Sequence, residues 1–120
     1  MCKILDVTLS AGETIIDVWD VYYTLNDNLM FFGALLVTTK RLFFEPKAEN
    51  AALDIIRSSS AITLHKPGII EISKESIVRS EPQKNNFSNK VALHLNNNEM
   101  HIFDRCMLPV EKIVSAINLV

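Results

Sequence analysis

Residues 29–45, LMFFGALLVTTKRLFFE, contain the feature that most restricts how this chain can fold. The first nine are apolar without a break, whereas a helix needs roughly 20 such residues to cross a membrane. A short run of this kind bounded by turn residues is typical of a β-strand that is covered on both faces. We therefore predict a strand over residues 29–38, a tight turn at residues 39–40, and a strand over residues 41–45. Pro46 ends the second strand because it has no N–H to donate.

The strand pattern continues on both sides of this run. Residues 14–25, TIIDVWDVYYTL, are rich in the β-branched and aromatic side chains that suit a pleated surface. A turn over residues 26–28, NDN, would join them to the next strand. Strand signals resume in residues 61–66, 68–73 and 76–82 and in a hairpin, KVALHLNNNEMHIF, over residues 90–103.

Two other segments have helical periodicity. Residues 47–60 are rich in Ala, Leu, Glu and Arg and allow about two helical turns. In residues 108–120, apolar side chains recur every three or four positions after Pro109, which is tolerated in the first turn of a helix. We predict a single domain over residues 1–120, mainly β: a barrel of about seven antiparallel strands capped by a C-terminal α-helix. Closing the sheet would remove its two edges.

Composition and charge limit the classes of partner. The 120 residues are 48% hydrophobic and 22% charged, which is typical of one globular core. The net charge of −2 disfavours a nucleic-acid partner, which would select a basic surface. The opening MCKILDVTLSAGE lacks the pattern of a secretory signal, and Cys2 and Cys106 have no metal or redox spacing. We expect a cytoplasmic protein that is at most peripheral at the cytosolic face of a membrane.

Two stretches then resemble a known family. GETIIDVWDVYYTL, followed by GALLVTTKRLFFEP, is similar to the hallmark of GRAM domains and of bacterial pleckstrin-homology-like domains. The matching positions are Gly12, Glu13, Gly33, Leu35, Thr38, Arg41, Leu42 and Phe44. The resemblance implies a barrel that binds membrane lipids or proteins, without catalysis. It also implies that the motif residues are structural, with Thr38 and Arg41 bracketing a turn.

The outer face of the apolar strand is the candidate site for a partner. Met30, Phe32, Ala34 and Leu36 share one face, and a barrel strand needs only its inner face apolar. The cover is either part of the chain, namely residues 47–60, the terminal helix or residues 4–9, or else a protein partner or a second copy. We expect the contact to use the apolar side chains around this strand, namely Trp19, Tyr22, Met30, Phe31 and Phe32.

Binding of anionic lipid head groups is the alternative function. Pleckstrin-homology domains hold phosphates with cations around the first loop, but YYTLNDNLMFF has no Lys or Arg. The best basic pair elsewhere is Lys40 and Arg41, with Lys84 and Lys90 as possible neighbours. Surface solubility explains these residues equally well.

Metal binding and catalysis have weaker signals. A two-residue turn at Asn97 and Asn98 would place His94 opposite His101, about 5 Å apart at Cβ, but no third zinc ligand is evident. Three glycines cannot form a phosphate-cradling loop, and no nucleophile has a base beside it in the sequence. We expect no metal, no cofactor and no enzymatic activity.

Overall fold

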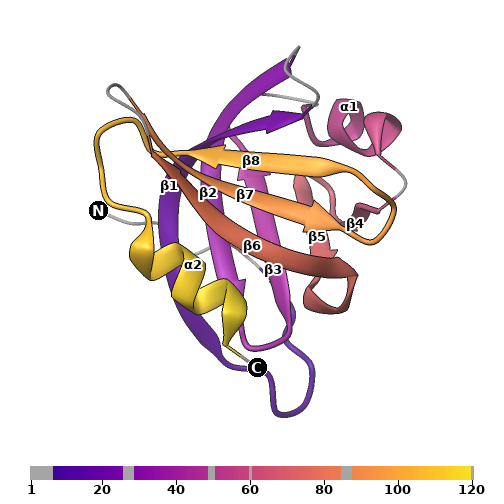
Figure 1. The fold of residues 1–120 in the computed structure, drawn as a ribbon. Helices are drawn as coiled ribbons and strands as arrows, with labels where there is room; N and C mark the ends of the chain where they lie inside the picture. Colours follow the sequence, from indigo (N-terminus) through magenta and orange to yellow (C-terminus); the bar gives the residue numbers. More distant parts are fainter. Residues whose placement is uncertain (1–6, 26–28, 49–50, 60, 85–87, 120) are drawn as a thin grey trace.

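The computed structural model describes residues 7–25, 29–48, 51–59, 61–84 and 88–119. They form one sheet of eight antiparallel strands, in the order β4-β5-β3-β2-β1-β8-β7-β6, with two α-helices (Figure 1). The elements are β1 Ile15–Leu25, β2 Leu29–Thr38, β3 Arg41–Pro46, α1 Ala51–Ser58, β4 Thr63–Lys66, β5 Ile69–Ser73, β6 Ile77–Lys84, β7 Asn89–Leu95, β8 Met100–Asp104 and α2 Glu111–Asn118. The predicted turn over residues 26–28 lies outside the described residues, as does Cys2.

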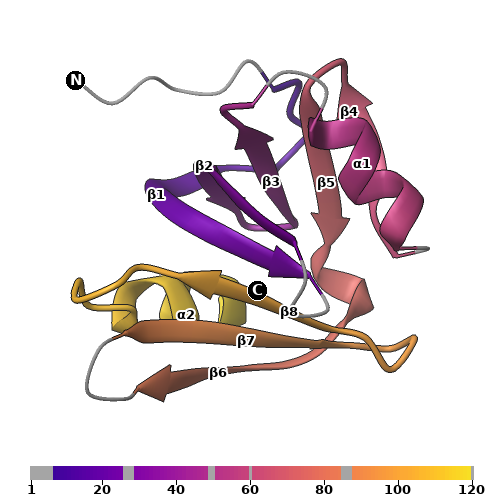
Figure 2. The same ribbon diagram turned by 90° about the horizontal axis from the view of Figure 1, so that it is seen from above.

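The sheet bends into two layers but is not closed. Figure 2 shows β6, β7 and β8 in one layer and β1, β2 and β3 in the other, with α2 near the open side. A mainly β fold with a C-terminal helix is therefore confirmed. Closure into a barrel is not found, because no pairing joins the edge strands β4 and β6 in the described part of the chain. The helix α2 packs against β6 and β2.

The strand count is eight rather than about seven. Residues 61–66, 68–73 and 76–82 each contribute a separate strand, and a single 3₁₀ turn, Lys74–Ser76, joins β5 to β6. The helix predicted within residues 47–60 is confirmed as α1.

The main core lies on the inner face of the sheet. Tyr23, Leu35, Phe44 and Phe103 are almost fully buried in it. Each helix contributes its apolar face, α1 through Ile55 and α2 through its buried Ile113, Ala116 and Ile117. Alternate residues of the strands and every third or fourth residue of the helices therefore face one common core.

Gly33 allows β2 and β3 to approach each other closely. A Cβ at this position would lie 2.3 Å from the carbonyl oxygen of Glu45 and 2.8 Å from the Phe44 ring. Any side chain here would force the two strands apart. Gly33 is thus required by packing rather than by an unusual backbone angle.

A smaller core covers part of the outer face. Leu36, Phe43 and Ile69 are buried there, and Val7 and Val18 pack against them. From the sequence, residues 4–9 were one of the segments expected to cover the outer face. Val7 of this segment does cover part of it. Residues 4–6 lie outside the described part of the chain.

The predicted register of the β7–β8 hairpin is wrong by one residue. His94 lies opposite Met100, and Leu93 lies opposite His101. The reason is a three-residue loop, residues 96–98, in which Asn98 takes a left-handed conformation with φ of 69°. His94 and His101 are consequently not cross-strand partners, and their side chains leave opposite faces of the sheet.

Candidate interaction surface

Exposed apolar side chains gather on the outer face near the β1–β2 hairpin. Tyr22, Met30 and Phe32 are 37%, 61% and 40% exposed, respectively. Tyr22 lies opposite Phe32 across the strand pair, and the centroids of their rings are 4.9 Å apart. Because both strands are long and paired on each side, these side chains project from a rigid surface.

The apolar surface continues onto β8. Ile102 lies opposite Thr24, which in turn lies opposite Met30. Met100 shares this face, since the alternate residues His101 and Phe103 are buried on the other. We call the whole set the outer-face patch: Tyr22, Met30, Phe32, Met100 and Ile102.

Charged residues border the outer-face patch. Asp104 lies opposite Tyr22, and the ammonium of Lys47 lies 5.8 Å from the centroid of the Phe32 ring. The next row toward the β2–β3 turn is acidic, because Asp20 and Glu45 each lie opposite Ala34. The row that contains Phe32 and Tyr22 therefore has Lys47 at one end and Asp104 at the other.

The five residues proposed from the sequence divide between the two faces. Tyr22, Met30 and Phe32 come together on the outer face, as described above. Trp19 and Phe31 lie on the inner face, where they are half-buried and pack against the main core. Because successive side chains of a strand point to opposite faces, the sequence alone already assigns these two groups to different faces. Met100 and Ile102 were missed, because the strand pairing that brings β8 beside β1 is not visible in the sequence.

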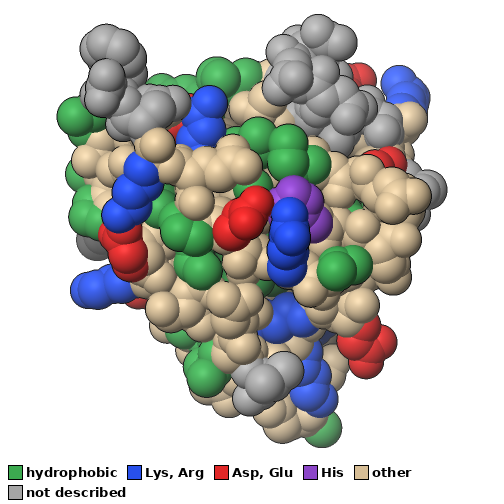
Figure 3. All heavy atoms as spheres, in the orientation of Figure 1, with side chains coloured by type: hydrophobic (Ala, Val, Ile, Leu, Met, Phe, Trp, Pro, Cys, Tyr) green, Lys and Arg blue, Asp and Glu red, His purple; other side chains and the backbone are tan. Residues whose placement is uncertain are grey.

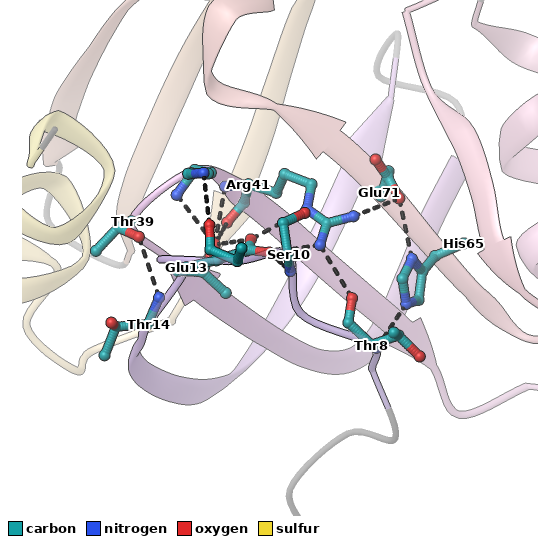
Figure 4. Close-up of polar contacts among 11 residues, drawn as sticks. Thr8, Ser10, Glu13, Thr14, Thr39, Arg41, His65 and Glu71 are labelled. Carbon is teal, nitrogen blue, oxygen red and sulfur yellow. Dashed lines mark hydrogen bonds and ion pairs between the residues drawn. The ribbon is translucent and has the colours of Figure 1, made fainter.

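The basic pair Lys40 and Arg41 lies at the opposite end of β2 and β3. Arg41 forms two bonds to the carboxylate of Glu13: Nη2 lies 2.5 Å from Oε1 and Nε lies 3.0 Å from Oε2. Its remaining nitrogen, Nη1, lies 3.3 Å from Glu71, and Nη2 also donates to the carbonyl of Thr8 (Figure 4). The guanidinium therefore already has protein acceptors and is not a free cation.

The Glu13 carboxylate accepts hydrogen bonds from several donors. Thr38 donates its hydroxyl to Glu13, and the backbone N–H of Ser10 donates to the same carboxylate at 2.9 Å. The hydrogen bonds from Arg41 outweigh the effect of burial and lower the pKa of Glu13 from 4.5 to about 2. The same contact raises the pKa of Arg41. This network fixes the segment before β1 onto the sheet and gives Glu13, Thr38 and Arg41 of the motif a structural role.

The network extends to a histidine on β4. Nδ1 of His65 lies 3.0 Å from Glu71, and the backbone N–H of Thr8 donates to its Nε2 (Figure 4). The His65 ring also meets the Phe43 ring edge-on, with centroids 4.7 Å apart. His65 thus ties the N-terminal segment to the short edge strand.

A hollow of about 530 Å³ lies beside Lys40 and Arg41. Lys74 also lines it, together with Ser10, Thr39, Ser73 and Glu75. The ammonium of Lys74 donates to the carbonyls of Ala116 and Leu119 at the end of α2, and that of Lys40 donates to Ala11. An anion in this hollow would compete with these carbonyl groups for the cations.

A buried chain of hydrogen bonds lies in the core, away from the network around Glu13. Tyr23 donates its hydroxyl to Nδ1 of His101, and Nε2 of His101 lies 2.9 Å from Glu99, whose carboxylate also accepts from Ser59. Tyr23 and His101 are fully buried. Burial lowers the pKa of His101, although Glu99 opposes the shift, and burial also raises the pKa of Tyr23. The chain ties the β7–β8 loop to the end of α1.

The described residues contain neither a three-ligand metal site nor a membrane-spanning helix. Their His, Cys, Asp and Glu side chains form no group of three that could hold a metal ion. His94 instead lies 3.0 Å from Glu81, which is also ion-paired with Arg79. None of the described helices has the length and hydropathy needed to cross a membrane.

Comparison with known proteins identifies a similar fold. No family model matches the sequence, and no curated protein matches it. Among solved structures, the fold is similar to that of the C-terminal domain of an unknown protein from Leishmania infantum. The TM-score is 0.61 and the identity is 15%, over 88% of this chain and 82% of that one. Such low identity establishes likeness of fold alone.

Proposed function

We propose that this chain is a non-catalytic binding module of the GRAM and pleckstrin-homology-like type, which associates through the outer-face patch. The bent sheet with a C-terminal helix packed across its open side supports that assignment of type. The observation that carries the function is the cluster of Tyr22, Met30 and Phe32, which project from paired strands into solvent. Aromatic residues and methionine are enriched in the cores of protein interfaces.

A second copy of the chain is the partner that the patch fits best. A two-fold contact requires a surface complementary to itself. An axis along the strands between β1 and β2 would place Phe32 on Tyr22 of the second copy. It would also place Lys47 near Asp104 of the second copy, because these charges lie at opposite ends of the same row.

The acidic row limits where such a contact lies. With the same axis, Glu45 would face Asp20 of the second copy, and like charges repel. The contact is therefore centred toward Met30 and Ile102, with the acidic row left in water. A different protein would need basic groups opposite Asp20 and Glu45.

Phe32→Asp tests this function, with Val78→Asp as a matched control. Val78 is 68% exposed on β6, outside the patch, so the control introduces the same charge on an exposed apolar site. At tens of micromolar, light scattering is expected to give a mass above the 13.6 kDa of one chain for wild type and Val78→Asp, and a monomer for Phe32→Asp. A monomeric wild type that Phe32→Asp leaves unchanged would refute association with a second copy.

Anionic-lipid binding at the hollow beside Lys40 is the second candidate function. The observation in its favour is that three basic residues, Lys40, Arg41 and Lys74, line one concave site, with a single acidic residue, Glu75, beside them. Its test uses Lys40→Glu alone, because changing Arg41 would also break the network around Glu13.

A further inference from the structure

The loop between β8 and α2 exposes four consecutive residues of apolar character. Met107 is 71% exposed and Leu108 is 53% exposed, and Cys106 and Pro109 beside them are exposed as well. Neither the outer-face patch nor the network around Glu13 includes these side chains. A run of this kind on a surface normally marks a contact with an apolar environment.

This loop is held in place by hydrogen bonds. At its start, the N–H of Cys106 donates to the Asp104 carboxylate at 2.7 Å, and the N–H of Leu108 donates to the carbonyl of Arg105. Asn89 on β7 donates its side-chain amide to the carbonyl of Leu108 at 3.0 Å. After the loop, Val110 is fully buried in the core. Met107 and Leu108 are therefore presented outward by an ordered backbone.

Cations surround the base of the loop. Arg105 belongs to it and donates from Nη1 to the carbonyl of Pro109. Lys84 and Lys90 lie at the adjoining ends of β6 and β7, and Lys112 lies in the first turn of α2. The nearby acids are Asp104, opposite Lys90, and Glu111, which is ion-paired with Lys84. Four cations and two acids leave this end of the molecule positive, although the whole chain carries −2.

We propose that the loop of residues 105–110 docks the protein on an anionic membrane surface. Met107 and Leu108 insert among the lipid head groups and upper acyl chains, and the surrounding cations remain at the level of the anionic head groups. Two projecting side chains offer little area for a stable contact with a folded protein, which typically buries about 1,200 Å² or more. Lipids, by contrast, can surround a small apolar tip on every side.

This membrane contact is separate from the proposed association through the outer-face patch. It also differs from the hollow beside Lys40, since that hollow lies at the C-terminal end of α2 and the loop precedes its N-terminal end. Figure 3 shows hydrophobic, basic and acidic side chains along the left side, where β8 leads toward α2 in Figure 1.

Cys106 supplies a site for the first test, because it is an exposed free thiol within the loop. In a Cys2→Ser background, its thiol is labelled with an environment-sensitive nitrobenzoxadiazole dye. Vesicles of phosphatidylcholine containing about one third phosphatidylserine are expected to raise the dye emission and shift it to shorter wavelength. Pure phosphatidylcholine should have a much smaller effect, and added salt should reverse the change. No change in emission with the anionic vesicles at low salt would overturn the proposal.

Sedimentation with the same vesicles locates the contact on unlabelled protein. Leu108→Asp is expected to weaken vesicle binding by at least about tenfold, because it replaces an inserted apolar side chain by a charge. Val78→Asp is the matched control and should bind as wild type does. Equal losses in both variants would mean that added negative charge alone is responsible, and the proposal would fail.

Two more variants separate the three candidate surfaces. Phe32→Asp should keep vesicle binding, and Leu108→Asp should keep the oligomeric state of wild type, so either function can fail without the other. Lys40→Glu should bind vesicles nearly as wild type does. Binding that Lys40→Glu abolishes and Leu108→Asp preserves would place the membrane contact at the hollow instead of the loop.

Discussion

Replacing Glu13 with glutamine is expected to destabilise the fold at neutral pH but not in strong acid. In the folded protein the Arg41 guanidinium holds the pKa of Glu13 at about 2, against an ordinary value of 4.5. A carboxylate whose pKa is lowered on folding contributes stability above its unfolded pKa, and that contribution is lost as the pH falls through the folded value. The difference of about 2.5 pH units corresponds to roughly 3 kcal/mol at pH 7, as an upper limit.

Urea denaturation of wild type and Glu13→Gln between pH 7 and pH 2 measures this effect. The difference in unfolding free energy should be constant down to about pH 5.5 and should shrink between about pH 4.5 and pH 2. Asp20→Asn is the control, because it neutralises an exposed carboxylate on β1 that is outside the network. A difference that stays the same down to pH 2 would refute the argument, since it would show that shape, and not charge, accounts for the role of Glu13.

Two further changes test the packing of the core. Gly33→Ala is expected to lower the unfolding free energy by about 1–3 kcal/mol, because its Cβ would meet the Glu45 carbonyl at 2.3 Å. Urea denaturation measures this loss, and an unchanged midpoint would mean that β2 and β3 can separate freely. The unfolding free energy of wild type should also fall as the pH drops below about 6.5, because burial lowers the folded pKa of His101 and the unfolded chain then binds more protons. His101→Gln should lack that part of the pH dependence; a variant with the same pH dependence as wild type would assign it to other groups.

The local pattern of residues predicted most elements of the fold. Alternation in residues 14–25 and the apolar run at 29–38 indicated β1 and β2, and the three-to-four spacing near the end indicated α2. Residue chemistry within a few positions is sufficient for this, because backbone periods determine which side chains share a face. The register of β7 and β8 was missed because three consecutive asparagines allow loops of two or three residues, and only the left-handed Asn98 decides between them.

The candidate surfaces depended on contacts between distant parts of the chain. The sequence showed that residues 29–37 are apolar on both faces, but it could not show that Val7 covers one part of the outer face and leaves Met30 and Phe32 exposed. It likewise identified Arg41 as a cation, whereas the structure shows it bonded to Glu13 and Glu71.

The sequence by itself therefore determined the class of fold and the residues that had to be buried somewhere. Only the tertiary structure decided which apolar and charged groups remain available to a partner. The physical reason is that burial and charge pairing are properties of the neighbours that folding brings together, and those neighbours lie tens of residues away along the chain.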